Sequence, residues 1–215
     1  SIVRASRLDN EDPMILAEYA LLRIDQGEIS EAERLVHEAE TSLSDKDVLH
    51  YIRGLIAAEL GNYPEARRRF DTVLVQDPKH VRARLNRATV AVLMNDHSLA
   101  LEDSELLLKQ YPDLDLARLR RAESLMGLGK WEWAEIALRE IIERKPGHVP
   151  ALISMGATLC ALDRAEEALT PLDEAIRLES DNPDAWHMRA QFYVEQGALP
   201  AALADFESAI RSEPS

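Results

Sequence analysis

The 215-residue chain has few of the residues that form disulfides, membrane spans or export signals. Cysteine occurs once, as Cys160, so no disulfide can form within the chain. The longest weakly polar stretch, residues 151–162, is too short to cross a bilayer, which takes about 20 apolar residues in a helix. No charged segment followed by an apolar one stands at the start, so we expect neither a signal peptide nor direct membrane insertion.

Basic residues are outnumbered by acidic ones. The chain has 25 lysines and arginines against 39 aspartates and glutamates, which gives a formal net charge of −14. Nucleic-acid binding depends mainly on contacts between cations and phosphates, so we expect no nucleic-acid partner. The charge is unevenly spread: both flanks of the chain are acidic, whereas its middle is near neutral and carries most of the arginines.

Side-chain patterns that support catalysis or metal binding are also scarce. The six histidines show no metal-ligand spacing such as H-E-x-x-H, and the sequence contains no glycine-rich phosphate-binding loop. Cys160 lies on an apolar stripe, where a cysteine more often packs than reacts. We therefore expect no enzymatic activity, no metal site and no cofactor.

The chain does contain a 34-residue repeat, which runs without insertion or deletion from Pro13 to the end. Two sets of small residues recur at this interval: Ala32, Ala66, Ala100, Ala134, Ala168 and Ala202, and also Ala20, Gly54, Ala88, Ala122, Gly156 and Ala190. The repeat defines the units 13–46, 47–80, 81–114, 115–148, 149–182 and 183–215, and residues 1–12 fit the end of a preceding unit. A fixed period of this length predicts one continuous solenoid, in which each unit buries its apolar face against its neighbours.

Each unit is expected to form two amphipathic helices. In 47–80 the apolar residues recur at three- and four-residue spacing in both halves: Ile52, Leu55, Ile56, Ala58 and Leu60, then Ala66, Phe70, Val73 and Leu74. When the positions of a unit are numbered 1 to 34, position 15 separates the halves and holds residues that tolerate a left-handed backbone: Gly27, Gly61, Asn95, Gly129, Asp163 and Gly197. Pro171 falls inside a second helix, where we expect a kink.

The pattern resembles that of the tetratricopeptide repeat family. The residues that carry the resemblance are small at positions 8 and 20, glycine at 15, aromatic or aliphatic at 17 and 24 and proline at 32, as in Gly54, Ala66, Gly61, Tyr63, Phe70 and Pro78. The resemblance covers essentially the whole chain and implies an all-α fold, a right-handed superhelix of helix-turn-helix repeats. Position 4, aromatic in the family, is Trp186 in one unit but Arg84 and Arg118 in two others, and Ser104 replaces the larger residue at position 24.

The resemblance also implies a non-catalytic scaffold that binds a partner peptide or helix in a concave groove lined by the first helix of each unit. The positions that face this groove in the family carry over to Tyr51, Leu55, Arg82, Leu85, Asn86, Thr89, Leu116, Leu119, Arg120, Glu123, Ile153, His187 and Gln191. Helical periodicity alone cannot separate an exposed inner face from a buried one, so the apolar members of this set are equally consistent with core positions.

Two features refine the expected binding surfaces. Arg82, Asn86 and Arg120 are candidates for anchoring an acidic or C-terminal group of the partner, because a guanidinium binds a carboxylate through two parallel hydrogen bonds. The alternative is internal pairing of these arginines with Glu123 and other acids. Position 19, charged in three units, is Leu99 and Trp133 in two adjacent ones, which indicates a possible second surface.

Other roles fit the same repeat pattern. The array could be an assembly or targeting region of a larger protein, such as a bacterial exopolysaccharide-export outer-membrane protein or a glycosyltransferase, or a structural self-assembly module. Residues 1–12 keep the phase of the repeat, and no polar capping helix follows the last unit. We therefore expect a piece of a longer array, or self-association through its exposed ends.

Overall fold

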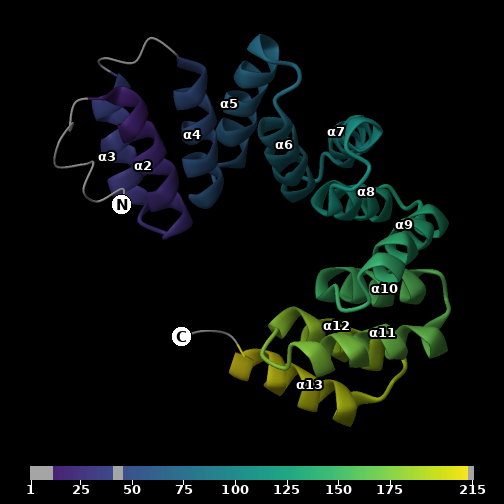
Figure 1. The fold of residues 1–215 in the computed structure, drawn as a ribbon. Coiled ribbons are helices and arrows are strands. Elements are labelled where there is room, and N and C mark those ends of the chain that lie inside the picture. The colour runs from purple at the N-terminus through teal and green to yellow at the C-terminus, as the bar shows by residue number, and fades with distance from the viewer. Residues whose placement is uncertain (1–11, 41–45, 213–215) are drawn as a thin grey trace. The chain divides into compact units, whose positions relative to one another are not determined.

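The structure is a computed structural model that describes residues 12–40 and 46–212 (Figure 1). These residues form helices and no strand, so the predicted all-α fold is confirmed. The helices are α2 (Pro13–Asp25), α3 (Ile29–Glu40), α4 (Lys46–Glu59), α5 (Tyr63–Gln76), α6 (Val81–Leu93), α7 (His97–Gln110), α8 (Asp115–Gly127), α9 (Trp131–Arg144), α10 (Val149–Ala161), α11 (Ala165–Leu178), α12 (Pro183–Glu195) and α13 (Leu199–Ser212). They form a solenoid of helical repeats.

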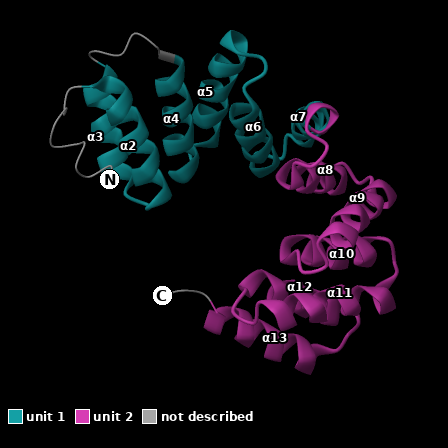
Figure 2. Cartoon of the chain, in the orientation of Figure 1, with its two compact units in different colours: residues 1–107 teal, residues 108–215 magenta. Residues whose placement is uncertain are grey.

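The chain divides into two compact units, residues 1–107 and 108–215 (Figure 2). In the described part of each unit, helices contact only helices that lie one or two places away along the chain, such as α2 with α3 and α4, or α10 with α11 and α12. This is the contact pattern of a solenoid, in which every repeat packs on its neighbours.

A residue with a left-handed backbone lies two residues after the end of the first helix of each pair. Glycine supplies this conformation at Gly27, Gly61, Gly129 and Gly197, where φ lies between 68° and 74°. Asn95 and Asp163 adopt it with φ of 58° and 59°, as the sequence predicts for position 15. The left-handed residue reverses the chain, and the second helix of the pair begins two residues later.

Close approach of the paired helices depends on the small residues at position 8. A Cβ atom added at Gly54 would lie 2.6 Å from Cε1 of Phe70, and one added at Gly156 would lie 2.5 Å from Cγ of Leu172. Phe70 and Leu172 are fully buried and occupy the volume that the glycines leave free. The large residue at position 24 and the glycine at position 8 are therefore one packing unit.

Two positions that looked unfavourable in the sequence are accommodated locally. Ser104 is fully buried in α7, and its hydroxyl donates a hydrogen bond to the carbonyl of Ala100 at 2.6 Å. This bond satisfies a polar group where the other units place a larger residue. Helix α11 runs from Ala165 to Leu178 without interruption, although Pro171 stands inside it.

Candidate functional site

All predicted groove residues of the first unit except Leu85 lie on what we call the α4–α6 surface, formed by Tyr51, Leu55, Arg82, Asn86 and Thr89. Tyr51 and Leu55 are one turn apart on α4, and the other three share a face of α6. Leu55, Asn86 and Thr89 line a hollow of about 190 Å³. Sequence reasoning therefore placed on one surface residues that the structure brings together from two helices.

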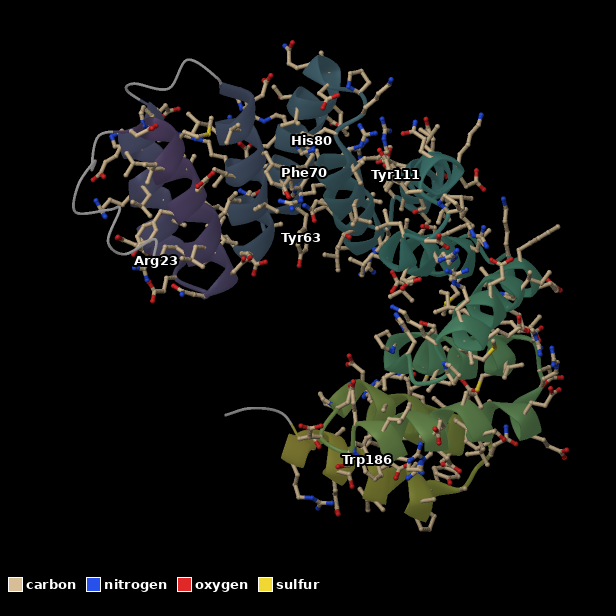
Figure 3. The ribbon with its side chains drawn as sticks, viewed as in Figure 1. Arg23, Tyr63, Phe70, His80, Tyr111 and Trp186 are labelled. Carbon is tan, nitrogen blue, oxygen red and sulfur yellow. The ribbon has the colours of Figure 1, made fainter. Side chains whose placement is uncertain are left out.

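A hydrogen bond joins the two helices across this surface. The Asn86 amide donates to the hydroxyl oxygen of Tyr51 at 3.1 Å. The Tyr51 ring lies against the rings of Phe70 and His80, with centroid distances of 6.1 and 5.1 Å; Figure 3 labels Phe70 and His80 on this part of the first unit. Burial raises the pKa of Tyr51, while the nearby Arg82 acts in the opposite direction. The phenol thus keeps its proton at neutral pH and can donate a hydrogen bond outward.

Arg82 and Arg120 differ in whether they form an ion pair within the protein, which is what separates internal pairing from availability for a partner's carboxylate. Arg82 is exposed, and within residues 12–40 and 46–212 no carboxylate pairs with it. Arg120 instead forms an ion pair with Glu123, one turn further along α8. Internal pairing therefore describes Arg120, whereas the guanidinium of Arg82 is free to bind an anion.

The predicted residues of the second unit are less uniform. Leu119 is only 4% exposed and packs in the core with Ala122 and Leu138, so the core position is the one of the two alternatives that describes it. Its spacing on α8 is the same for a core residue and a surface residue, so the sequence could not separate them. Leu116 is 51% exposed, and Ile153 is half-buried.

The last two predicted groove residues contact each other. His187 and Gln191 are both exposed on α12, and their side chains hydrogen-bond at 2.8 Å. In the first unit, Leu85 is half-buried on α6. The two residues of the predicted second surface belong to different units: Leu99, in the first, is half-buried, and Trp133, in the second, is 64% exposed.

A recurrent ion-pair arrangement was missed in the sequence. Arg87 on α6 donates through Nε and Nη2 to the two oxygens of Asp103 on α7, both at 2.7 Å, and through Nη1 to Asp71 on α5, also at 2.7 Å. Asp103 is fully buried and accepts a further bond from Arg84 at 2.8 Å. The hydrogen bonds to Asp103 raise the pKa of Arg87. We call this arrangement an Arg–Asp bridge.

The second unit contains the same Arg–Asp bridge. Arg189 on α12 binds both oxygens of Asp205 on α13, at 2.7 and 2.8 Å, and reaches Asp173 on α11 at 2.6 Å. In both bridges the arginine occupies position 7 and the buried aspartate position 23, and the second aspartate is at position 25 of the preceding repeat. Comparing charged residues at the same position in repeats that are three units apart would have revealed the bridge.

Three further observations concern metal-ligating groups, the cysteine and membrane spans among the described residues. Within them, no group of three or more histidine, cysteine, aspartate or glutamate side chains is placed to hold a metal ion. Burial raises the pKa of Cys160, and Glu195 adds to the effect, so the thiol stays protonated at neutral pH. None of the helices that the structure describes is long and apolar enough to cross a membrane.

Comparison with known proteins gives consistent results. A family model described as tetratricopeptide repeat matches residues 51–115 and 155–215. Protein FlbA of Caulobacter vibrioides is 26% identical over 162 residues, which are 75% of this chain and 27% of FlbA. The chain thus spans little more than a quarter of the length of that curated relative.

Solved structures show the same fold. A tetratricopeptide repeat protein from Parabacteroides merdae matches 100% of this chain with 85% of its own, at a TM-score of 0.81 and 17% identity. YrrB, described as a TPR protein with an unusual peptide-binding site, matches 88% of this chain with 97% of its own, at a TM-score of 0.66 and 23% identity. At these identities the likeness concerns the fold alone.

Proposed function

The chain belongs to the tetratricopeptide repeat family, and on that premise we propose that its α4–α6 surface binds a segment of a partner protein. The fold is that of a protein-interaction scaffold, and proteins of this family are generally non-catalytic. The proposal concerns which surface of the scaffold is used and what chemistry it recognises.

The observation that supports the proposal is that the α4–α6 surface combines an apolar hollow, a pair of hydrogen-bonding side chains and an unpaired cation. The hollow beside Leu55 and Thr89 offers an apolar contact, the Tyr51–Asn86 pair offers polar groups, and Arg82 offers an unpaired cation. A volume of about 190 Å³ is below the range of roughly 300–1,000 Å³ typical of small-molecule sites. It is better suited to one side chain of a peptide than to a free metabolite.

The free guanidinium indicates the partner's chemistry. A guanidinium binds a carboxylate in proteins through two parallel hydrogen bonds, with matching planar geometry. We therefore infer a partner segment with an acidic side chain or a C-terminal carboxylate next to an apolar residue. The description of YrrB as having a peptide-binding site supports a peptide as the ligand class.

A charge reversal with a matched control tests this. Partners captured from extract with the 215-residue chain are identified, and the affinity of each is then measured by titration calorimetry. We expect Arg82→Glu to weaken binding about tenfold or more, since a hydrogen bond to a charged group contributes about 1.5–3 kcal/mol. Arg68→Glu, the same change at an exposed arginine on α5, should leave the affinity unchanged. Equal affinity of both variants would exclude the α4–α6 surface as the binding site.

A further inference from the structure

A second and larger hollow lies in the second unit, between α9, α10 and α11. Its volume is about 860 Å³, within the range of roughly 300–1,000 Å³ of known ligand sites. Its floor consists of Leu152, Met155 and Leu159 of α10, and Ile142 of α9 and Pro171 of α11 line its walls. We call it the α9–α11 groove.

The groove occupies the place that an Arg–Asp bridge occupies in the repeats 81–114 and 183–215. Met155 stands at position 7, where the bridges have Arg87 and Arg189. Pro171 stands at position 23, where the bridges have the buried Asp103 and Asp205. Methionine and proline cannot form the bridge, so its ion pairs are replaced here by an apolar hollow. The difference from the two repeats that contain the bridge, 81–114 and 183–215, is visible in the sequence.

Pro171 also changes the backbone of the groove wall. Proline has no N–H, so the carbonyl of Glu167, four residues earlier in α11, lacks its usual helical donor. Glu167 and Pro171 both line the groove. The wall therefore offers a backbone acceptor for an N–H group of an incoming chain, since such a carbonyl otherwise depends on water for its hydrogen bond.

Charged side chains surround the apolar floor, and the acids outnumber the bases. The lining contains four carboxylates and two guanidinium groups: Glu143, Glu166, Glu167, Glu174, Arg139 and Arg164. Both arginines are bound to Glu135, at 2.5 and 2.7 Å. They are thus already neutralised within the protein.

The four carboxylates that line the groove differ in their partners: Glu167 and Glu174 each bind an arginine, whereas Glu143 and Glu166 do not pair with a basic side chain of the described residues. Arg164 also binds Glu167 at 2.7 Å, and Arg177 binds Glu174 at 2.6 Å. Across the described ranges 12–40 and 46–212, no basic side chain pairs with Glu143 or Glu166. These two come from α9 and α11, so the groove has an unpaired carboxylate on each side.

We propose that the α9–α11 groove binds a partner segment with an apolar side chain flanked by lysine or arginine. The apolar side chain enters between Met155 and Pro171, the basic groups meet Glu143 and Glu166, and an N–H donates to the carbonyl of Glu167. A second copy of this chain fits poorly, because each copy carries a formal charge of −14. The site is independent of the α4–α6 surface, which lies in the other unit and recognises the opposite charge.

Methyl NMR on the full chain locates binding directly. The chain has five methionines, so labelling their methyl groups gives a simple spectrum in which Met155→Leu identifies the Met155 signal. The probe is a short synthetic peptide of leucine and lysine, and its control has glutamate in place of lysine. We expect the lysine peptide to move the Met155 signal and leave the signal of Met14, an exposed methionine of the first unit, in place. The glutamate peptide should move neither.

Two variants then separate the groove from the overall acidity of the chain, with binding followed by the anisotropy of a labelled peptide. Changing Met155→Arg, Pro171→Asp and Arg139→Asp together recreates the residues of an Arg–Asp bridge, and should weaken binding tenfold or more. Glu143→Lys with Glu166→Lys should reverse the preference, so that the glutamate peptide binds more tightly than the lysine peptide. Circular dichroism checks that both variants remain folded.

Three results would overturn the proposal. The first is an unmoved Met155 signal when the lysine peptide binds. The second is the absence of binding at peptide concentrations up to about 1 mM, beyond which the binding free energy is weaker than about −4 kcal/mol. The third is an unchanged preference in the Glu143→Lys, Glu166→Lys variant, whose substitutions lie on exposed helix surface and keep the core intact. This last comparison decides the matter even if the triple variant fails to fold.

Discussion

The buried aspartate of an Arg–Asp bridge is a residue that this fold buries at a cost in free energy. Moving a carboxylate out of water costs several kcal/mol, and the cost is offset only when both oxygens are bound. Asp103 meets this condition, because Arg87 binds both of its oxygens and Arg84 binds one of them again. We infer that the bridge mainly fixes the register of α6 against α7, since an apolar pair of similar size would stabilise the contact as well.

Removing one member of the bridge should therefore be severe. We expect Asp103→Ala to lower the free energy of unfolding of the first unit by about 3–5 kcal/mol, because the largely buried Arg84 loses its carboxylate partner and Arg87 keeps only Asp71. Urea unfolding followed by far-UV circular dichroism measures this. The control is Glu105→Ala, an exposed acid on the same helix, which should change stability by about 0.5 kcal/mol or less. Similar effects of the two substitutions on the free energy of unfolding would show that breaking the bridge is not destabilising.

For single residues, the sequence predicted which side chains share a helix face better than it predicted their burial or their ion-pair partners. It indicated which residues share the α4–α6 surface, because positions on a helix face follow from the repeat. It could not show that Arg82 is unpaired and Arg120 paired. The sequence places acidic residues near both arginines, and only the coordinates show that Glu123 binds Arg120. It also missed Asp103, because a lone charged residue in a helix is usually exposed.

Among the elements, the helix ends were the most predictable feature. Position 15 holds glycine in four repeats and Asn95 or Asp163 in two, and all six have the left-handed backbone expected of them. The physical reason is local: a side chain with a Cβ atom is strained in this conformation, and short polar side chains tolerate it best. Local rules of this kind can be applied from sequence without knowing the packing.

Asn95 allows the rule to be tested without disturbing the core. Its side chain is exposed and its φ is 58°, so substitution affects mainly the backbone. We expect Asn95→Ala to destabilise the first unit by about 1 kcal/mol, whereas Asn95→Gly should be neutral or slightly stabilising. Thermal unfolding of the two variants side by side measures the difference. If alanine is tolerated as well as glycine, the left-handed turn is not needed at this position.

At position 4, two different side chains make an equivalent hydrogen bond to the turn before the repeat: the aromatic Trp186 and the arginine Arg84. The Trp186 indole donates to the carbonyl of Ser180 at 2.9 Å (Trp186 is labelled in Figure 3). Arg84 donates to the carbonyl of Pro78, the equivalent position of an earlier repeat, at 2.6 Å. Both side chains tie the start of a repeat to the turn before it. What looked like a departure from the family pattern is a substitution that preserves the hydrogen bond.

For the molecule as a whole, the repeat period predicted the solenoid but not its division into two compact units. The period passes through residue 107 without interruption, and the division falls inside α7. The side chains of α7 give the physical reason. Its interior face buries Ser104, at the position where other second helices bury Val36, Phe70, Leu138 and Leu172. Among the described residues, the large core clusters reach Val90 in the first unit and begin again at Leu119.

This arrangement makes the energetics of the chain local. In a solenoid the stability is approximately a sum over repeats and their neighbour contacts, so damage in one repeat should weaken nearby helices most. The tryptophans offer a selective probe, because Trp131, Trp133 and Trp186 all belong to the second unit. Tryptophan fluorescence therefore reports unfolding of that unit, whereas far-UV circular dichroism reports helices of both.

We expect Phe70→Ala to separate the two signals. Phe70 is fully buried between α4 and α5, and truncating a buried phenylalanine costs about 3–5 kcal/mol. Circular dichroism should then show an early transition in urea, while the midpoint seen by tryptophan fluorescence stays at its wild-type value. Phe192→Ala, the matched change in the core of the second unit, should lower the fluorescence midpoint. A fluorescence midpoint lowered equally by both variants would mean that the chain unfolds as one cooperative body, and the locality inferred from its neighbour contacts would be wrong.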